Sequence, residues 1–84
     1  MITTPQVNNN GTSKQELLEG ALKVRRLIGE ASRAIQENFP HGRDYQTLPA
    51  THYIAARKDW EEHLKALIAI EHDFLELAIA ISDQ

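Results

Sequence analysis

The segment NFPHGRDYQTLP, residues 38–49, decides the fold, because it separates two long stretches that contain no proline. Pro40 disfavours helical geometry at Phe39, so a helix that arrives from the N-terminal side ends just before that residue. Pro49 suits the first turn of a new helix. With Gly42 between the two prolines, the segment is predicted to be a connection and not a continuation of either helix.

Both neighbours of this connection have helical patterns. On the N-terminal side, Ser13 and Glu16 have the spacing of a capping box, in which each side chain satisfies a free backbone donor. On the C-terminal side, neither glycine nor proline occurs after Pro49. The predicted organisation is a flexible N-terminal tail over residues 1–12 and a helical hairpin over 13–84, with a helix at 13–38, a loop at 39–49 and a helix at 50–82.

In each predicted helix, apolar residues recur at alternating steps of four and three, the pattern of a coiled-coil-like contact. In the second helix the apolar sector spans about 200° at about 100° per residue, which is wider than one neighbouring helix covers. We therefore expect a second surface to pack there. The predicted seam of the first helix is Leu17, Ala21, Val24, Ile28, Ala31 and Ile35, and that of the second is Trp60, Leu64, Leu67, Glu71, Phe74, Ala78 and Ile81.

The position at which the chain reverses sets the pairing of the two helices. If it reverses near Asp44, in the middle of the loop, Ser13 lies level with Leu75. The second helix then extends about seven residues, or roughly 10 Å, beyond the start of the first. The apolar end of the second helix would have no partner in the hairpin, which is typical of an association surface. In an alternative, Ile2 and Val7 fold back over it.

Size supports association as well. A domain of 84 residues usually needs disulfides, a metal or a partner chain, and the absence of cysteine excludes disulfides. The predicted fold class is all-α: an antiparallel two-helix hairpin that self-associates into a four-helix bundle, as a homodimer in preference to a tetramer. The predicted oligomer interface is Trp60, Leu64, Leu67, Ile68, Glu71, Phe74, Leu75, Ala78, Ile79 and Ile81.

Glu71 falls at the centre of the apolar sector, where an unpaired carboxylate is costly to bury. With the reversal near Asp44, Lys14 lies on the facing side of the first helix, and we predict a buried Lys14–Glu71 pair. A pair with Arg25 across the oligomer interface is an alternative. Such a pair can fix the register of an assembly. Exposure of Glu71 to water, and a catalytic or metal-binding role, are the remaining alternatives.

Two pairs of histidine and carboxylate, Asp59 with His63 and His72 with Glu76, have the four-residue spacing of metal ligands on one helix face. Each pair supplies only two ligands, and the Glu-x-x-His signature of di-iron bundles is absent. We interpret both pairs as solvated surface and predict neither a metal nor another cofactor.

The loop carries the most chemically mixed patch of the sequence, although an ordinary polar turn is its simpler interpretation. Nowhere does the sequence suggest a nucleophile beside a base and an orienting group, so we expect no enzymatic activity. The candidate loop site is His41, Arg43, Asp44 and Tyr45.

Charge narrows the classes of partner. The net charge is −3, and acidic residues interrupt the basic ones of the first helix, so nucleic acid is not expected as a partner. Charged residues interrupt the apolar run, and the N-terminus lacks a signal sequence, so we expect a cytoplasmic protein off the membrane. The expected function is interaction or assembly. The alternative is an adaptor or chaperone-like module whose Leu75–Ile81 stripe binds an amphipathic helix of another protein.

The segment NFPHGRDY, residues 38–45, and the long helix after it, with His63 and the apolar run from Leu64 to Ile81, together resemble short helical-hairpin proteins of bacterial and phage genomes. The resemblance implies a helical hairpin. It assigns no activity to the chain.

Overall fold

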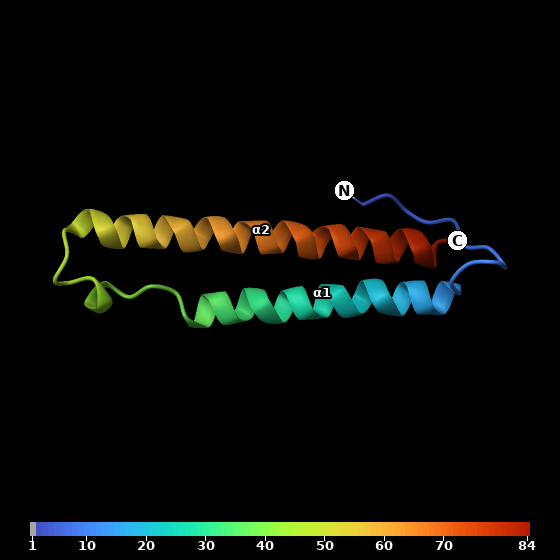
Figure 1. The fold of residues 1–84 in the computed structure, drawn as a ribbon, viewed down its shortest axis with the longest axis horizontal. Coiled ribbons are helices and arrows are strands. Elements are labelled where there is room, and N and C mark those ends of the chain that lie inside the picture. Colours follow the sequence, from blue (N-terminus) through green and yellow to red (C-terminus); the bar gives the residue numbers. More distant parts are fainter. Residues whose placement is uncertain (1) are drawn as a thin grey trace.

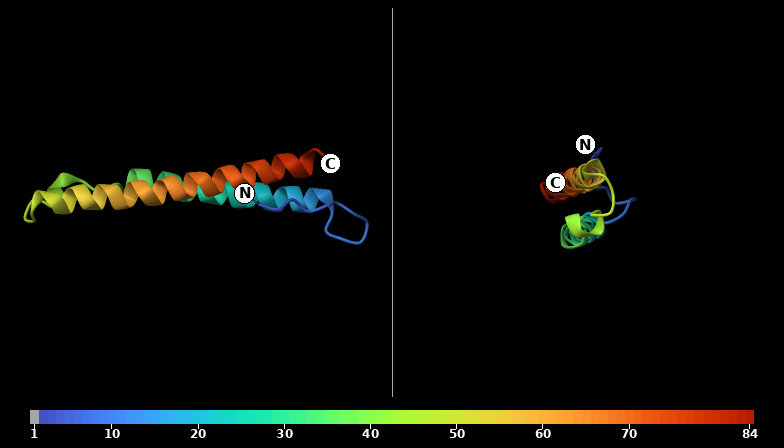
Figure 2. Two further views of the ribbon diagram at one scale, coloured as in Figure 1. Left: turned by 90° about the horizontal axis from the view of Figure 1, so that it is seen from above. Right: turned by 90° about the vertical axis from the view of Figure 1, so that its left-hand side faces the viewer.

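The computed structural model describes residues 2–84 as two long helices joined by a loop (Figure 1). Helix α1 is Lys14–Glu37, the 3-10 turn η1 is Gly42–Asp44, and helix α2 is Ala50–Ser82. The helices run antiparallel: they lie side by side in Figure 1, and the right-hand view of Figure 2, down their length, shows them next to each other. The all-helical hairpin predicted from the sequence is therefore confirmed for the described residues, which contain no strand.

Local chemistry determines where the helices begin and end. Ser13 caps α1, because its Oγ accepts a hydrogen bond from the Glu16 backbone N–H at 3.1 Å. At the other end, the Asn38 side-chain amide donates to the Ala34 carbonyl at 2.8 Å, and Pro40 prevents a further helical turn. Pro49 is the N-terminal capping residue of α2 and provides no side-chain cap.

The pairing of the helices differs from the one expected. The Lys14 ammonium donates to the Gln84 carbonyl at 2.9 Å, so the start of α1 is level with the end of the chain. The offset from the expected pairing is about ten residues. The predicted overhang of α2 is wrong, because the loop continues alongside α2 before the chain reverses near Pro49. The Tyr45 ring, for example, lies 6.0 Å from the Tyr53 ring.

The predicted apolar seam is confirmed on α2 and is partly wrong on α1. On α2, each residue of the predicted seam is buried or half-buried, so that seam is confirmed. On α1, Val24 and Ala31 are exposed, and their inclusion in the seam was wrong. Arg25 and Ser32 take these places because α1 is turned to bring Arg25 beside Glu71. We call the covered positions the inner seam of α1: Leu18, Ala21, Arg25, Ile28, Ser32 and Ile35.

The buried core is small. Among the described residues, the buried apolar side chains are Ala21, Ala78 and Ile81, and all three lie at the end of the hairpin that holds both termini. The molecule measures 62 × 18 × 17 Å. Its radius of gyration is 18.3 Å, where a compact domain of this length has about 12 Å. Most apolar side chains of the chain are thus covered on one side only.

The N-terminal segment lies back along the C-terminal end of α2 (Figure 1). The Val7 backbone N–H donates to Gln84 Oε1 at 2.8 Å, and Gln84 Nε2 donates to the Pro5 carbonyl at 2.7 Å. Ile2, Pro5 and Val7 are half-buried. The structure thus favours the alternative in which this segment folds back, while Met1 of the predicted tail lies outside the described residues.

Candidate functional site

A second seam runs along α1, displaced by one residue position from the inner seam. Its residues again recur at steps of three and four, and none of them is charged. Leu27 is 46% exposed, and only Leu17 is half-buried. We call this stripe the outer seam: Leu17, Gly20, Val24, Leu27, Ala31 and Ala34.

Charged residues mark only one edge of the outer seam. Glu16, Lys23, Glu30 and Glu37 recur there every seventh residue, and all four are exposed. Glu30 Oε1 accepts a hydrogen bond from Arg26 Nη1 at 3.3 Å, whereas Lys23 makes no hydrogen bond or ion pair within residues 2–84. The opposite edge adjoins the inner seam. The outer seam is therefore flanked by apolar residues on the side toward α2 and by charged residues on the side away from it.

A shallow cavity of about 300 Å³ opens between the helices and is lined by Ile35, Asp59, Trp60 and His63. Ile35 lies one turn beyond Ala31 on α1, so this cavity adjoins the C-terminal end of the outer seam. The Trp60 ring forms its apolar wall and meets the Phe39 ring edge-on at 6.2 Å. The lining is apolar at Ile35 and Trp60 and polar at Asp59 and His63.

The predicted oligomer interface falls largely on the covered face of α2. Seven of its ten residues belong to the α2 seam that faces α1 of the same chain. Ile68 and Ile79 are exposed, Ile79 at 51%, and Leu75 is half-buried. The overhang on which part of this expectation depended is absent from the structure. Contact of these residues with another chain stays a prediction, and Ile68 and Ile79 are its exposed members.

Glu71 lies beside Arg25 of the same chain, with Oε1 4.0 Å from the Arg25 Nε. The predicted Lys14–Glu71 pair is wrong, because Lys14 is level with the chain terminus. Both side chains of the observed pair are partly exposed. The carboxylate lies against Gly29 of α1: a Cβ at this position would lie 3.4 Å from Glu71 Oε1, an ordinary van der Waals contact.

The four residues of the candidate loop site line one open hollow of about 400 Å³, together with Trp60. His41, Arg43 and Asp44 are exposed, and the Asp44 backbone N–H donates to the His41 carbonyl at 3.1 Å. Tyr45 is half-buried against Tyr53. This arrangement is that of a polar turn with one anchored ring.

The two predicted histidine–carboxylate pairs differ in their contacts. His63 Nδ1 lies 2.7 Å from the backbone carbonyl oxygen of Asp59. The contact therefore uses the main chain of Asp59 and not its carboxylate. His72 Nδ1 lies 3.6 Å from Glu76 Oε1, and Asp73 brings a third ligand atom to within 4.8 Å of these two. Sequence reasoning missed Asp73, although its three-residue spacing from Glu76 places the two on one face. His72 and Glu76 are exposed to solvent.

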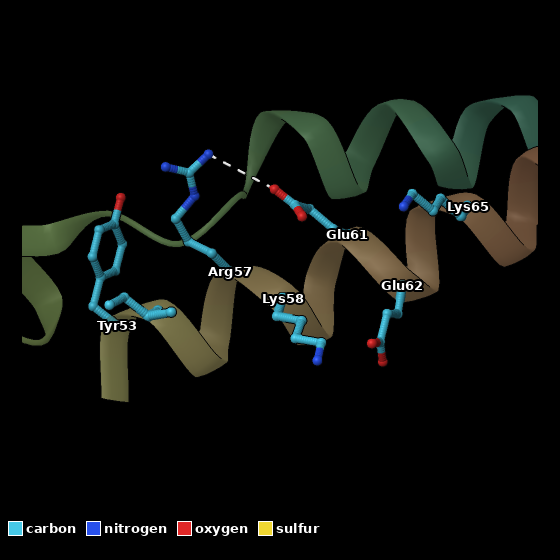
Figure 3. A pocket seen from close by; sticks show the side chains of 7 residues that line it. Tyr53, Arg57, Lys58, Glu61, Glu62 and Lys65 are labelled. Carbon is cyan, nitrogen blue, oxygen red and sulfur yellow. Dashed lines mark ion pairs between the residues drawn. The ribbon is translucent and has the colours of Figure 1, made fainter. Parts of the chain in front are cut away.

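A charged hollow of about 530 Å³ follows the N-terminal half of α2 (Figure 3). Arg57 reaches toward Glu61, with Nη2 3.9 Å from Oε1, and its guanidinium also lies over the rings of Phe39 and Tyr53. Lys58, Glu62 and Lys65 alternate in sign along the same face. The alternation cancels the local potential, which disfavours this hollow as a site for anions or nucleic acid.

Comparisons of the chain with protein-family models, with curated proteins and with solved structures found no match. Within residues 2–84, neither helix has an apolar stretch long enough to cross a membrane. The outer seam is the stripe of α1 that combines exposed apolar side chains, Val24 and Leu27, with an absence of charge along its described residues.

Proposed function

We propose that the chain is a small helical assembly protein that associates with a second copy of itself through the outer seam of α1. The observation that carries the proposal is that this uncharged stripe is exposed while the buried apolar core of the described residues is limited to Ala21, Ala78 and Ile81. A continuous exposed apolar stripe on a soluble chain is characteristic of an association surface.

The exposed area of the chain supports the same proposal. The accessible surface is 6326 Å², where a folded monomer of this size has about 5,000 Å². A stable interface between two proteins buries about 800 Å² on each partner. The excess of about 1,300 Å² is thus enough to supply such an interface.

Two hairpins that meet face to face form a four-helix bundle, in which each helix contacts two neighbours. The activity proposed for the chain is therefore binding, without catalysis or a cofactor. The alternative, an adaptor that offers the Leu75–Ile81 stripe to another protein, has less support, because Ile81 is 1% exposed and Ala78 is buried in the same core.

Light scattering behind size exclusion, over a concentration series, tests the proposal. We expect a dimer for the unmodified chain and a monomer for Leu27→Glu, which places a charge in the outer seam. Ile79→Glu is the matched control, since Ile79 is as exposed as Leu27 but lies on α2. We expect it to remain dimeric, with both variants keeping their helical circular dichroism. An unmodified chain that is monomeric at every concentration would refute the proposal.

A further inference from the structure

The two edges of the outer seam determine which way round a second copy fits. One edge carries Lys23 and Glu30, and the other edge is formed by Ala21, Ile28 and Ile35 of the inner seam, which face α2. When two helices pack in parallel, opposite edges meet, and Lys23 would lie against Ile28 of the second copy. When they pack antiparallel, each edge meets its own equivalent. Only the antiparallel arrangement puts charged residues with charged residues and apolar with apolar ones.

We propose that the α1 helices of two copies pack antiparallel along the outer seam, about a two-fold axis between Val24 and Leu27. This inference rests on the proposed function and specifies its geometry. Val24 of each copy lies across from Leu27 of the other, which places Leu17 across from Ala34 and Gly20 across from Ala31. All six seam positions then have a partner in the second copy.

Side-chain volume favours the same arrangement. A parallel pair would stack identical residues, so Leu27 would meet Leu27 while Gly20 met Gly20, and the required distance between the helices would change sharply from layer to layer. The antiparallel pairing sets Leu17 against an alanine and collects the larger side chains at the centre. The apolar edges of the two copies meet on the side that α2 covers, where the remaining contacts of a four-helix bundle form.

Charge fixes the register of this pair. In this register Lys23 and Glu30 of the second copy lie on the same edge, about 3 Å apart along the helix axis, and the two-fold axis repeats the contact. Lys23 is exposed and has no partner within residues 2–84, and Glu30 has a second carboxylate oxygen besides the one that faces Arg26. Glu16 is offset by the same amount from Glu37 of the second copy at each end, where both are exposed and the repulsion is screened by salt.

A charge-swap series tests the pairing. We expect Lys23→Glu and Glu30→Lys each to raise the dimer dissociation constant about tenfold, because both create two like-charge contacts. The double variant restores opposite charges and should return to within about threefold of the unmodified chain. Lys58→Glu, an exposed change on α2, is the control and should leave the constant unchanged. Unaffected single variants, or a double variant as weak as the singles, would overturn the proposed register.

A distance measurement tests the direction independently. The chain has no cysteine, so Glu16→Cys gives a single attachment point for a nitroxide label. In the antiparallel pair, the residue level with Glu16 of the second copy lies about 19 residues along α1 from Glu16, so the two labels are about 30 Å apart along the helix axis. A parallel pair brings them to about 10 Å. A dimer with the short distance would overturn the inference and leave the proposed function intact, whereas a monomer in light scattering would remove both.

Discussion

The inner and outer seams of α1 differ by one residue position, and the less apolar of the two faces α2. The inner seam contains Arg25 and Ser32, whereas every residue of the outer seam is apolar or glycine. If hydrophobicity alone decided which face of α1 is covered, the outer seam would be buried. We infer from this difference that a polar constraint helps to decide the packing of the two helices, which leaves the more apolar stripe of α1 exposed.

The polar constraint is Glu71. This residue lies in the middle of the α2 seam, and a carboxylate there requires a cation or water. Turning α1 so that the outer seam faced α2 would bury Leu27 but carry Arg25 away from Glu71. In the observed packing, Arg25 stays beside the carboxylate, which lies against Gly29. The outer seam is exposed as a consequence.

The largest expected effect comes from breaking the apolar core that α2 forms against the inner seam of α1. Ile81→Ala removes a side chain that is 1% exposed, and we expect a loss of about 2–4 kcal/mol in the free energy of unfolding, measured by denaturant titration. Ile79→Ala is the control on the same helix. With Ile79 51% exposed, the loss should stay below about 1 kcal/mol. Equal losses would mean that the core does not lie at this end of the hairpin.

The next effect comes from removing the polar constraint. Arg25→Ala should destabilise the fold by about 1 kcal/mol, a modest loss because both side chains of the pair are partly exposed. Arg25→Met combined with Glu71→Leu should recover this loss or exceed it, since an apolar pair often replaces an ionic one without cost. Glu71→Leu alone should leave the oligomeric state unchanged, because the pair lies within one chain. A marked loss of oligomer would instead assign Glu71 to the interface.

A smaller effect is expected from substituting the two glycines of α1, of which only Gly20 lies in the outer seam. Gly20→Ala should stabilise each chain by roughly 0.5–1 kcal/mol, since a Cβ at Gly20 meets nothing within 4 Å. It should also weaken the dimer severalfold, because Gly20 lies in the outer seam, where the second copy approaches. Gly29→Ala, beside Glu71 and outside the outer seam, should leave the dimer unchanged. Equal affinities for Gly20→Ala and the unmodified chain would argue against close packing at Gly20.

Local signals in the sequence were enough to predict the helices. Ser13, Pro40 and Pro49 act on their immediate neighbours, and the structure begins and ends its helices beside them. The α2 seam could also be predicted, because α2 has one continuous apolar heptad pattern. The point of reversal could not, because it depends on Tyr45 packing against Tyr53, a contact that no spacing rule indicates.

The α1 seam was ambiguous for a physical reason. Two heptad patterns overlap on this helix, and at two turns the choice lies between Val24 and Arg25 and between Ala31 and Ser32. The sequence favours the apolar member of each pair, but the packing partner selects the other. The fold-back of the N-terminal segment was equally hard to predict, since it depends on hydrogen bonds to the side chain of Gln84.

The smallest expected effect is a gain in stability at a buried polar position of the inner seam. Ser32 is 5% exposed, and its Oγ has no hydrogen-bond partner within the described residues. Ser32→Ala removes this unsatisfied hydroxyl and introduces the best helix former, so we expect a gain of about 0.5 kcal/mol in the free energy of unfolding. Ser13→Ala is the matched control in the same helix: it removes the cap and should cost about 1 kcal/mol. If Ser32→Ala destabilised the protein, its hydroxyl would have a partner after all. Ser32 as well as Arg25 would then favour the observed packing of α1.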